Sequence, residues 1–293
     1  MNRSFKRLVV LTALASLVSA GSALADSNTS GVPIPAVPKF DSSNAGNYGK
    51  QLAYYMDKRD SGWRDYYAKA TMTLTDARGD SVTRDVVFKI LEGGNGNKTV
   101  VTFQSPADIR GVAALVHEHP GSTDDTWLYL PSSRRTRRIS GANRTASFQG
   151  TEFTYEDLSQ VVVENYTWKY LGDGTAGGAQ AYKLEAKPNY KDTGYSKIVA
   201  YLNKDLWRIE KAEFYDKANR LLKTVTFSNW RHYHGRFWRP NSYTMVNHQT
   251  RKSTKIEATS MFVNLSRYKK KDGSTRDNMT EEQFTKRALE TNQ

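Results

Sequence analysis

Two His-x-His pairs offer the side chains best suited to holding a metal ion. They are His117 with His119, and His232 with His234. On a β-strand, residues two apart project from one face, so each pair presents two imidazoles in a way that suits zinc. A catalytic zinc site takes three protein ligands, and neither pair has a third ligand at a diagnostic spacing. We therefore interpret these residues as surface or hairpin histidines and predict no metal site. A zinc-dependent hydrolase remains as a remote alternative.

An arginine-dense segment is the second group of residues with chemical capability. It follows the strand-like residues 126–130 and contains Arg134, Arg135, Arg137 and Arg138. Guanidinium groups bind phosphates and carboxylates through paired hydrogen bonds. Arg134, Arg135 and Arg137 are therefore candidate contacts for an anionic headgroup at the rim of a binding cavity. Arg138 is next to an isoleucine in strand-like sequence, so we expect a structural role for it.

Carboxylates follow the arginines closely, at Glu152, Glu156 and Asp157. The arginines could pair with them, or could lie on a solvated loop, and both alternatives stay open. Glu156 and Asp157 do not form a convincing acid–base pair, because adjacent residues do not face one another on a helix. We expect instead a helix start, in which Thr154 is the cap and Asp157 occupies the third helical position.

Several reaction classes lack their usual residues. The chain has no cysteine, which excludes disulfides, thiolate metal sites and thiol nucleophiles. It contains no G-x-S-x-G nucleophile motif. The glycine-rich stretches at residues 93–96 and 172–178 lie between expected strands and open no helix, so they do not fit a phosphate-binding loop. We predict that the protein is not an enzyme and uses no cofactor.

The N-terminal residues have the features of a secretory signal peptide. Arg3, Lys6 and Arg7 precede an apolar run, and Ala23-Leu-Ala25 fits the small-x-small cleavage pattern. We predict that residues 1–25 are a cleaved signal peptide and that the mature protein is periplasmic. Residues 26–43, which are rich in proline and small residues, are expected to form an extended, mobile linker. Residues 44–293 would form a single domain.

The chain is strongly basic, with a formal net charge of +13. In an exported protein, nucleic acid is not an expected partner. Anionic lipid headgroups or an acidic protein fit this charge better.

Apolar and polar residues alternate through much of the chain from residue 66 to residue 265, which predicts many short strands joined by tight turns. A helix is expected from Asn44 or Asn47 to about Arg59, and Thr280-Glu-Glu-Gln283 fits a capping box for a short C-terminal helix. So many strands indicate one antiparallel sheet that must curl. We predict an α+β fold in which a large curved antiparallel sheet carries a few helices on its concave face.

The alternating strands leave one apolar face with few helices to fill it. This pattern indicates a buried face, either of an ordinary core or of a cavity. The candidate lining residues are Met72, Leu74, Val86, Phe88, Val101, Phe103, Leu115 and Leu128.

Residues 126–158 carry a combination of motifs that resembles one family. W-L-Y-L-P is followed by the arginine run and then by F-Q-G-T-E-F-T-Y-E-D-L. This order resembles the larger form of the LolA-like outer-membrane lipoprotein-sorting proteins. Further segments that match the family occur in the same order at residues 103–111, 195–198, 207–216 and 222–223. The resemblance implies an open, strongly curved half-barrel with helices lying across its mouth.

The resemblance also implies a function. In LolA-like carriers the apolar face forms a cavity that receives acyl chains, so we expect a periplasmic carrier of a lipoprotein or a lipid. Its partners would be an inner-membrane exporter, often of the RND (MMPL-like) type in larger family members, and an outer-membrane acceptor. An alternative is an accessory protein that docks on such an exporter or on an envelope sensor without carrying cargo.

Overall fold

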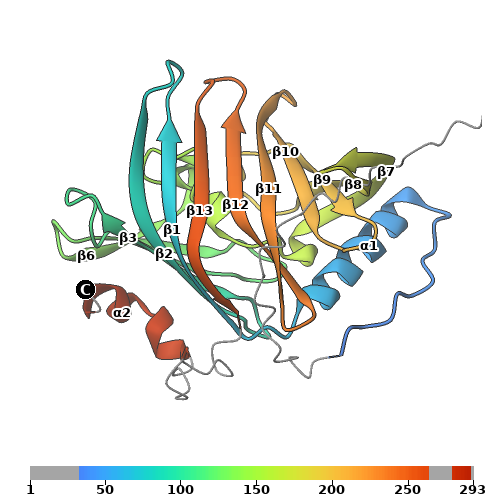
Figure 1. Cartoon of the computed structure of the whole chain (residues 1–293), viewed down its shortest axis with the longest axis horizontal. Helices are drawn as coiled ribbons and strands as arrows, with labels where there is room; N and C mark the ends of the chain where they lie inside the picture. The colour runs from blue at the N-terminus through green and yellow to red at the C-terminus, as the bar shows by residue number, and fades with distance from the viewer. Residues whose placement is uncertain (1–32, 264–278, 292–293) are drawn as a thin grey trace, which may run out of the picture.

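The protein is built on one curved, unclosed sheet. Its structure, a computed structural model, describes residues 33–263 and 279–291. Within these ranges thirteen antiparallel strands form a single sheet in the order β6-β5-β4-β3-β2-β1-β13-β12-β11-β10-β9-β8-β7 (Figure 1). Two α-helices and a few 3-10 helices accompany it. The prediction of an α+β fold with one large curved antiparallel sheet is confirmed.

The strands are five to thirteen residues long. Their bounds are β1 Asp65–Thr75, β2 Ser81–Leu91, β3 Lys98–Ser105, β4 Ala113–His117, β5 Asp125–Leu130, β6 Arg135–Ile139, β7 Tyr166–Ala176, β8 Ala179–Pro188, β9 Lys197–Asn203, β10 Ile209–Tyr215, β11 Leu221–Tyr233, β12 Phe237–Asn247 and β13 Ser253–Val263. A solvated loop was one of the alternatives left open for the arginine segment, but Arg135, Arg137 and Arg138 lie in β6. The prediction of a glycine-rich hairpin loop at residues 173–178 was wrong in its start, because β7 continues to Ala176.

The order of the strands explains how the chain encloses a space. The chain starts in the middle of the sheet at β1 and reaches one edge at β6. It then crosses to the opposite edge at β7 and returns to the middle, where β13 pairs with β1. We call residues 140–165 the crossover segment. It contains the 3-10 helices η1 Gly141–Thr145, η2 Glu156–Leu158 and η3 Val163–Asn165. It packs against one face of the sheet, which we call the inner face.

The α-helix α1, Ala45–Asp60, also packs on the inner face. Its N-cap is Asn44, whose side chain accepts hydrogen bonds from the backbone N–H groups of Gly46 and Asn47, as the sequence predicts. Leu52 and Tyr55 on this helix join an apolar cluster with residues of β7 to β12, among them the fully buried Leu184. The helix therefore closes one end of the concave side (Figure 1).

The C-terminal helix lies on the other face of the sheet. A 3-10 turn, η5 Glu281–Phe284, leads into α2, Lys286–Thr291. Phe284 is fully buried against β4 and β5 residues, including Leu115 and Tyr129. The expectation that helices cover the concave face is therefore right for α1 and wrong for α2. The expected capping box does not form, because the side chain of Thr280 makes no cap hydrogen bond.

The predicted signal peptide, residues 1–25, lies outside the described residues. Residues 33–43 of the predicted linker contain no helix or strand, but they are not detached from the fold. Phe40 packs against Tyr55 and Trp207, and the Tyr55 hydroxyl donates a 2.9 Å hydrogen bond to the carbonyl of Pro35. No helix among residues 33–263 and 279–291 is long and apolar enough to cross a membrane.

Candidate functional site

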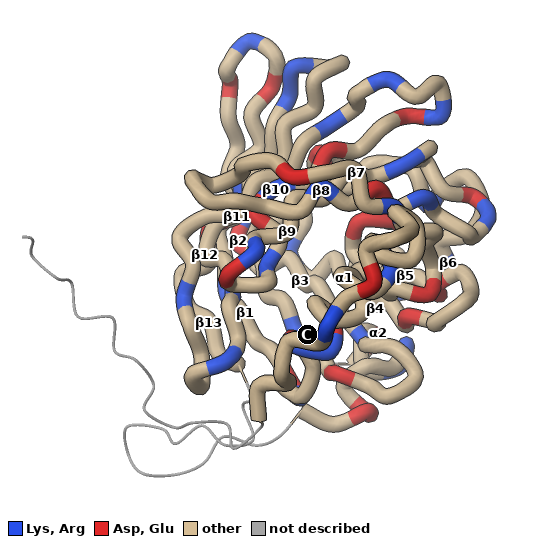
Figure 2. Tube along the Cα trace, turned by 90° about the vertical axis from the view of Figure 1, so that its right-hand side faces the viewer, with Lys and Arg blue, Asp and Glu red and all other residues tan. Residues whose placement is uncertain are grey.

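A cavity of about 360 Å³ lies between the inner face of the sheet and the crossover segment. This volume falls in the range of about 300–1,000 Å³ that is typical of small-molecule sites. Seen end-on, β11 to β13 and β4 to β6 lie on opposite sides of the molecule (Figure 2). Most of the lining side chains are aliphatic or aromatic: Tyr66, Met72, Phe88, Ile90, Val101, Phe148, Phe153, Leu158, Val161, Tyr166, Trp168, Ala186, Tyr190, Tyr195, Ile198, Ala200, Ile209, Ala212, Phe214, Val225, Phe227, Tyr243, Met245 and Ile256.

Three of the eight residues expected to line a cavity do so, namely Met72, Phe88 and Val101. Four others also lie on the inner face but pack under the crossover segment, in an apolar cluster that contains Phe148 and Tyr155. These four, which are not among the residues that line the cavity, are Leu74, Val86, Phe103 and Leu128. The crossover segment covers them, so they form ordinary core there.

Leu115 was assigned to the wrong face of the sheet. In β4 it pairs with Val100 and Trp127, whereas its neighbour Ala114 pairs with the cavity-lining Val101. Because side chains alternate along a strand, Leu115 points to the outer face, where it packs against Phe284. Shifting the register of an alternating pattern by one residue reverses every assignment to a face.

Much of the lining comes from the second half of the sheet, where none of the predicted lining residues lies. Val225 and Phe227 on β11 alternate with exposed or half-buried residues as clearly as Met72 does on β1. The alternation was therefore a usable signal. The contribution of Phe148 and Phe153 was harder to foresee, because they belong to irregular backbone.

Polar contacts from several strands hold the crossover segment in place. On one side, Arg84 of β2 donates a 2.5 Å hydrogen bond to the carbonyl of Gln149. On the other, Asn247 of β12 donates to the carboxylate of Glu152, and the Glu152 N–H donates to the hydroxyl of Thr254 on β13. The crossover segment is thus bonded to strands on either side of β1, namely β2 on one side and β13 and β12 on the other.

Asp157 is the most heavily bonded of these anchors. Its Oδ2 lies 2.5 Å from Nζ of Lys223 on β11 and accepts hydrogen bonds from the N–H and hydroxyl of Thr154. Its Oδ1 accepts a 2.7 Å hydrogen bond from the hydroxyl of Tyr195. Burial and the neighbouring carboxylate Asp157 raise the pKa of Tyr195, so this hydroxyl stays protonated. The predicted helix start with Thr154 as its cap is wrong: the turn that follows is a 3-10 helix whose N-cap is Tyr155, and no side chain caps it. Thr154 and Asp157 do interact, but Thr154 is the donor.

Glu156 is held in a similar way on the same wall of the cavity. Its two carboxylate oxygens accept hydrogen bonds from the Tyr190 hydroxyl at 2.7 Å and from the Gly194 N–H at 2.8 Å. Burial raises the pKa of Glu156 despite these donors. Both carboxylates that line the cavity therefore bond to the protein. A ligand would meet mainly carbon surface.

The last part of the crossover segment contributes two exposed residues to the cavity wall. Gln160 and Val161 line the cavity, and 47% of the Val161 surface is exposed. Glu118, which follows β4 and is buried, fixes this part of the wall by accepting hydrogen bonds from the backbone N–H groups of Gln160 at 2.7 Å and Asn97 at 3.1 Å. Burial raises the pKa of Glu118 to about 7.

The arginines do not lie at the rim of this cavity. Arg134, Arg135 and Arg137 are exposed at the β6 edge of the sheet, and none is among the residues that line the cavity. They do not bind Glu152, Glu156 or Asp157, because those carboxylates have the partners given above. Arg138 points to the opposite face of β6 and forms an ion pair with Asp125, which fits its expected structural role.

The four histidines of the His-x-His pairs do not converge. The His117 ring contacts the carbonyl of Phe284, and the His119 ring contacts the carboxylate of Asp125. His232 stacks on Trp238 with ring centroids 4.4 Å apart, and the buried His234 bonds to the carbonyl of Val263. The described part of the chain contains no group of three His, Cys, Asp or Glu side chains that could hold a metal ion.

Comparisons with known proteins agree with the architecture. A family model described as "Uncharacterized protein" matches residues 95–291. None of the curated proteins matches the chain. Among solved structures, the chain is similar to a "putative outer membrane lipoprotein-sorting protein domain" from Vibrio parahaemolyticus, with 38% identity and a TM-score of 0.76 over 83% of this chain and 98% of the other.

Two further structures extend this likeness. A DUF1329 family protein from Desulfovibrio piger shares 27% identity with a TM-score of 0.76, over 84% of this chain and all of the other. A LolA superfamily protein from Nitrosomonas europaea shares 20% identity with a TM-score of 0.61, over 82% of this chain and 98% of the other, and this shows a common fold. On the strength of the 38% identity across nearly the whole Vibrio domain, the protein belongs to the same outer-membrane lipoprotein-sorting protein family as that domain, and it shares the fold of the LolA superfamily protein.

Proposed function

We propose that this protein is a periplasmic carrier that binds the acyl chains of a lipoprotein or a lipid in the cavity and shields them between the inner and outer membranes. The observation that carries the proposal is the apolar cavity of about 360 Å³ enclosed by the sheet and the crossover segment. Each methylene group that leaves water for such a cavity contributes about 0.8 kcal/mol, so a few carbons suffice for useful affinity. No catalytic step is part of this proposal.

Three further observations support it. The lining carboxylates bond to protein donors, which leaves carbon surface for a ligand. Gln160 and Val161 line the cavity and are exposed, so we infer that a chain enters beside them. The sequence predicts export, which would place the protein between the two membranes. An inner-membrane exporter as donor and an outer-membrane acceptor are the partners this role requires.

Native mass spectrometry of protein purified from its own periplasm tests the proposal directly, together with uptake of a fluorescent fatty acid. We expect a copurifying lipid or lipoprotein and saturable uptake of the probe. Absence of both would overturn the carrier role. An empty cavity together with one stoichiometric membrane partner would support the accessory role instead.

A matched pair of variants locates the binding. Ala212 lines the cavity, so Ala212→Phe should fill part of it and weaken probe binding by at least about tenfold, which corresponds to the loss of two methylene contacts or more. Val246 is exposed on the outer face of β12, so Val246→Phe adds the same ring without touching the cavity. Equal probe binding by the two variants would show that the probe binds elsewhere.

A further inference from the structure

The two edges of the unclosed sheet are protected differently. At the β7 edge, α1 lies against the strand so closely that a Cβ atom on Gly49 would meet the backbone N of Tyr170 at 2.6 Å. At the other edge, β6 forms strand pairing only with β5, and α2 contacts β6 from the outer face. Within residues 33–263 and 279–291, no further backbone hydrogen bond joins Arg135–Ile139 to another element. An edge strand of this kind has N–H and C=O groups available to a further strand.

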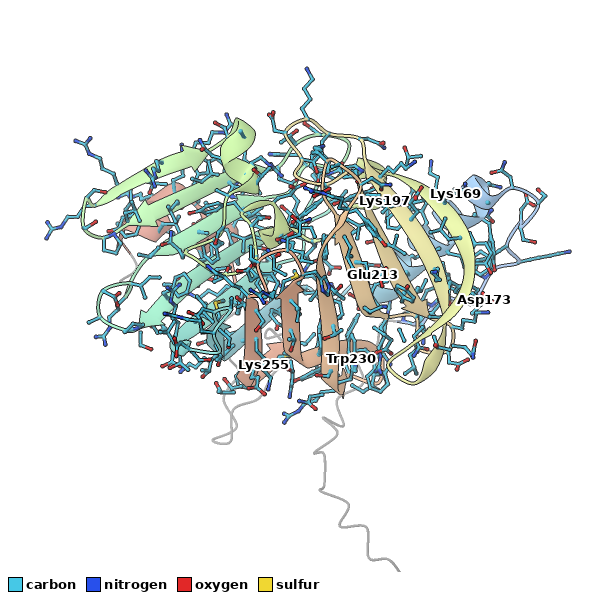
Figure 3. The ribbon with its side chains drawn as sticks, turned by 90° about the horizontal axis from the view of Figure 1, so that it is seen from above. Lys169, Asp173, Lys197, Glu213, Trp230 and Lys255 are labelled. Carbon is cyan, nitrogen blue, oxygen red and sulfur yellow. The ribbon has the colours of Figure 1, made fainter. Side chains whose placement is uncertain are left out.

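The side chains of β6 add a regular charge pattern to this edge. Arg135 and Arg137 pair with Leu130 and Leu128, so both lie on the inner-face side of the strand, two residues apart. Both are exposed, and no ion pair involves either of them in the described structure. Arg138, on the opposite side, is neutralised by Asp125. Long side chains with nitrogen at their tips project from this green end of the sheet in Figure 3.

This pattern discriminates between strands that could add to the edge. A second copy of the chain, paired edge to edge, would bring its own Arg135 and Arg137 against these arginines, and like charges on neighbouring strands repel. An extended segment with carboxylates at every second position would place them along one face at the spacing of the two guanidinium groups. The two arginines therefore disfavour a second copy of this chain and favour an extended acidic segment.

We propose that the β6 edge is a docking site for an extended acidic segment of another protein, which adds as a strand beside β6 and pairs its alternating carboxylates with Arg135 and Arg137. Backbone hydrogen bonds would supply affinity, and the ion pairs would set the register. This inference is independent of the proposed carrier function, because the cavity lining and the arginine edge share no residue.

Fluorescence anisotropy with labelled peptides of about nine residues, near the length of one strand, tests the proposal. The first peptide alternates glutamate with threonine. The second has the same composition with the glutamates in one block, and the third is the alternating peptide with N-methyl groups on every second backbone nitrogen. We expect saturable binding of the first peptide only. Equal binding of all three would mean general attraction by a basic surface and would overturn the proposal.

Charge-reversal variants identify the site. Arg135→Glu/Arg137→Glu should weaken binding of the alternating peptide at least about tenfold, because two ion pairs become repulsive. The control, Lys169→Glu/Lys252→Glu, changes the net charge equally at exposed lysines several strands away from β6 and should leave binding within about twofold (Lys169 in Figure 3). Uptake of the fatty-acid probe should stay unchanged in both variants, which separates this result from a failure of the carrier role.

Two other occupants are outcomes that would count against the proposal. Sedimentation of the wild-type protein would reveal a dimer that dissociates in Arg135→Glu/Arg137→Glu, if a second copy covers the edge. If the edge instead binds a membrane surface, the wild-type protein should float with vesicles that contain anionic lipid. The same double variant should lose this vesicle binding, and the alternating peptide should not displace the wild-type protein from the vesicles.

Discussion

Nζ of Lys223 on β11 lies 2.5 Å from Oδ2 of Asp157 in the crossover segment, and only 2% and 6% of these two side chains are exposed. Lys223 also donates a 3.1 Å hydrogen bond to the carbonyl of Glu152. One buried ammonium therefore bonds to two points of the crossover segment. This arrangement fixes irregular backbone to a regular strand beside the cavity, and it explains how a loop can form part of a stable cavity wall.

Removing one partner of this pair should destabilise the protein strongly. Lys223→Met leaves the Asp157 carboxylate buried without its cation, and breaking a buried pair in this way costs about 3–5 kcal/mol. Equilibrium denaturation with guanidinium chloride measures the loss. The matched control is Lys255→Met, which removes a half-exposed partner of Glu257 and should cost about 0–1 kcal/mol. Equal losses in the two variants would contradict a structural role for the buried pair.

Glu118 makes the stability of the fold depend on pH. Burial raises its pKa from 4.5 to about 7, so between these values the folded protein binds a proton that the unfolded chain has released. Stability must therefore fall as the pH rises from about 4.5 to about 7, and then level off for this group. The shift corresponds to at most about 3 kcal/mol.

Glu118→Gln isolates this contribution. The amide cannot ionise, so the variant should lose less stability than the wild type between pH 5 and pH 8, by about 1–3 kcal/mol. The amide has one oxygen that can accept a hydrogen bond, whereas the carboxylate accepts from two backbone N–H groups, those of Asn97 and Gln160. The variant should therefore lose about 1 kcal/mol of stability already at low pH, by the same amount at every pH. Denaturation curves at pH 5 and pH 8 separate the pH-independent loss of stability from the pH-dependent one. Parallel pH profiles for both proteins would show that Glu118 titrates normally.

The sequence predicted the regular parts of this fold better than the irregular ones. Alternation placed Met72, Phe88 and Val101 on the inner face, because the side-chain period of a strand depends only on local geometry. The N-cap at Asn44 is equally local. Leu115 shows where this reasoning fails, since alternation defines two faces but does not say which one faces the cavity.

The crossover segment could not be predicted by such rules. Asp157 bonds to Lys223, 66 residues away, and Glu152 bonds to Asn247, 95 residues away. No repeat or spacing in the sequence indicates either of these long-range contacts. From the sequence alone, the nearby arginines are the obvious partners for these carboxylates, and nothing local marks Arg135 and Arg137 as part of an edge strand.

The outer-face packing of the C-terminal residues should matter for stability and not for the cavity. Phe284 is fully buried against Leu115 and Tyr129, so Phe284→Ala should cost about 3–5 kcal/mol. Because the sheet separates this cluster from the cavity, the affinity for a fatty-acid probe should stay within about twofold at a temperature where the variant is folded. Thermal unfolding and probe titration measure the two effects. A large loss of affinity in the folded variant would mean that α2 acts on the cavity through the sheet.

Two glycines on α1 test how the helix protects the β7 edge. In an exposed helix interior, replacing glycine with alanine usually stabilises by about 1 kcal/mol. At Gly49 the added methyl would lie 2.6 Å from the backbone N of Tyr170 and 2.7 Å from the backbone C of Lys169, and backbone cannot move aside as a flexible side chain can. Gly49→Ala should therefore destabilise by about 1–3 kcal/mol, the usual cost of overpacking.

Gly46→Ala is the control. The nearest contacts of its added methyl would be the Asn44 side chain at 3.2 Å and the Trp168 carbonyl at 3.7 Å, so a change within about 1 kcal/mol is expected. If denaturation shows Gly49→Ala to be as stable as Gly46→Ala, then α1 does not lie tightly on the edge of β7, and the difference between the two sheet edges disappears.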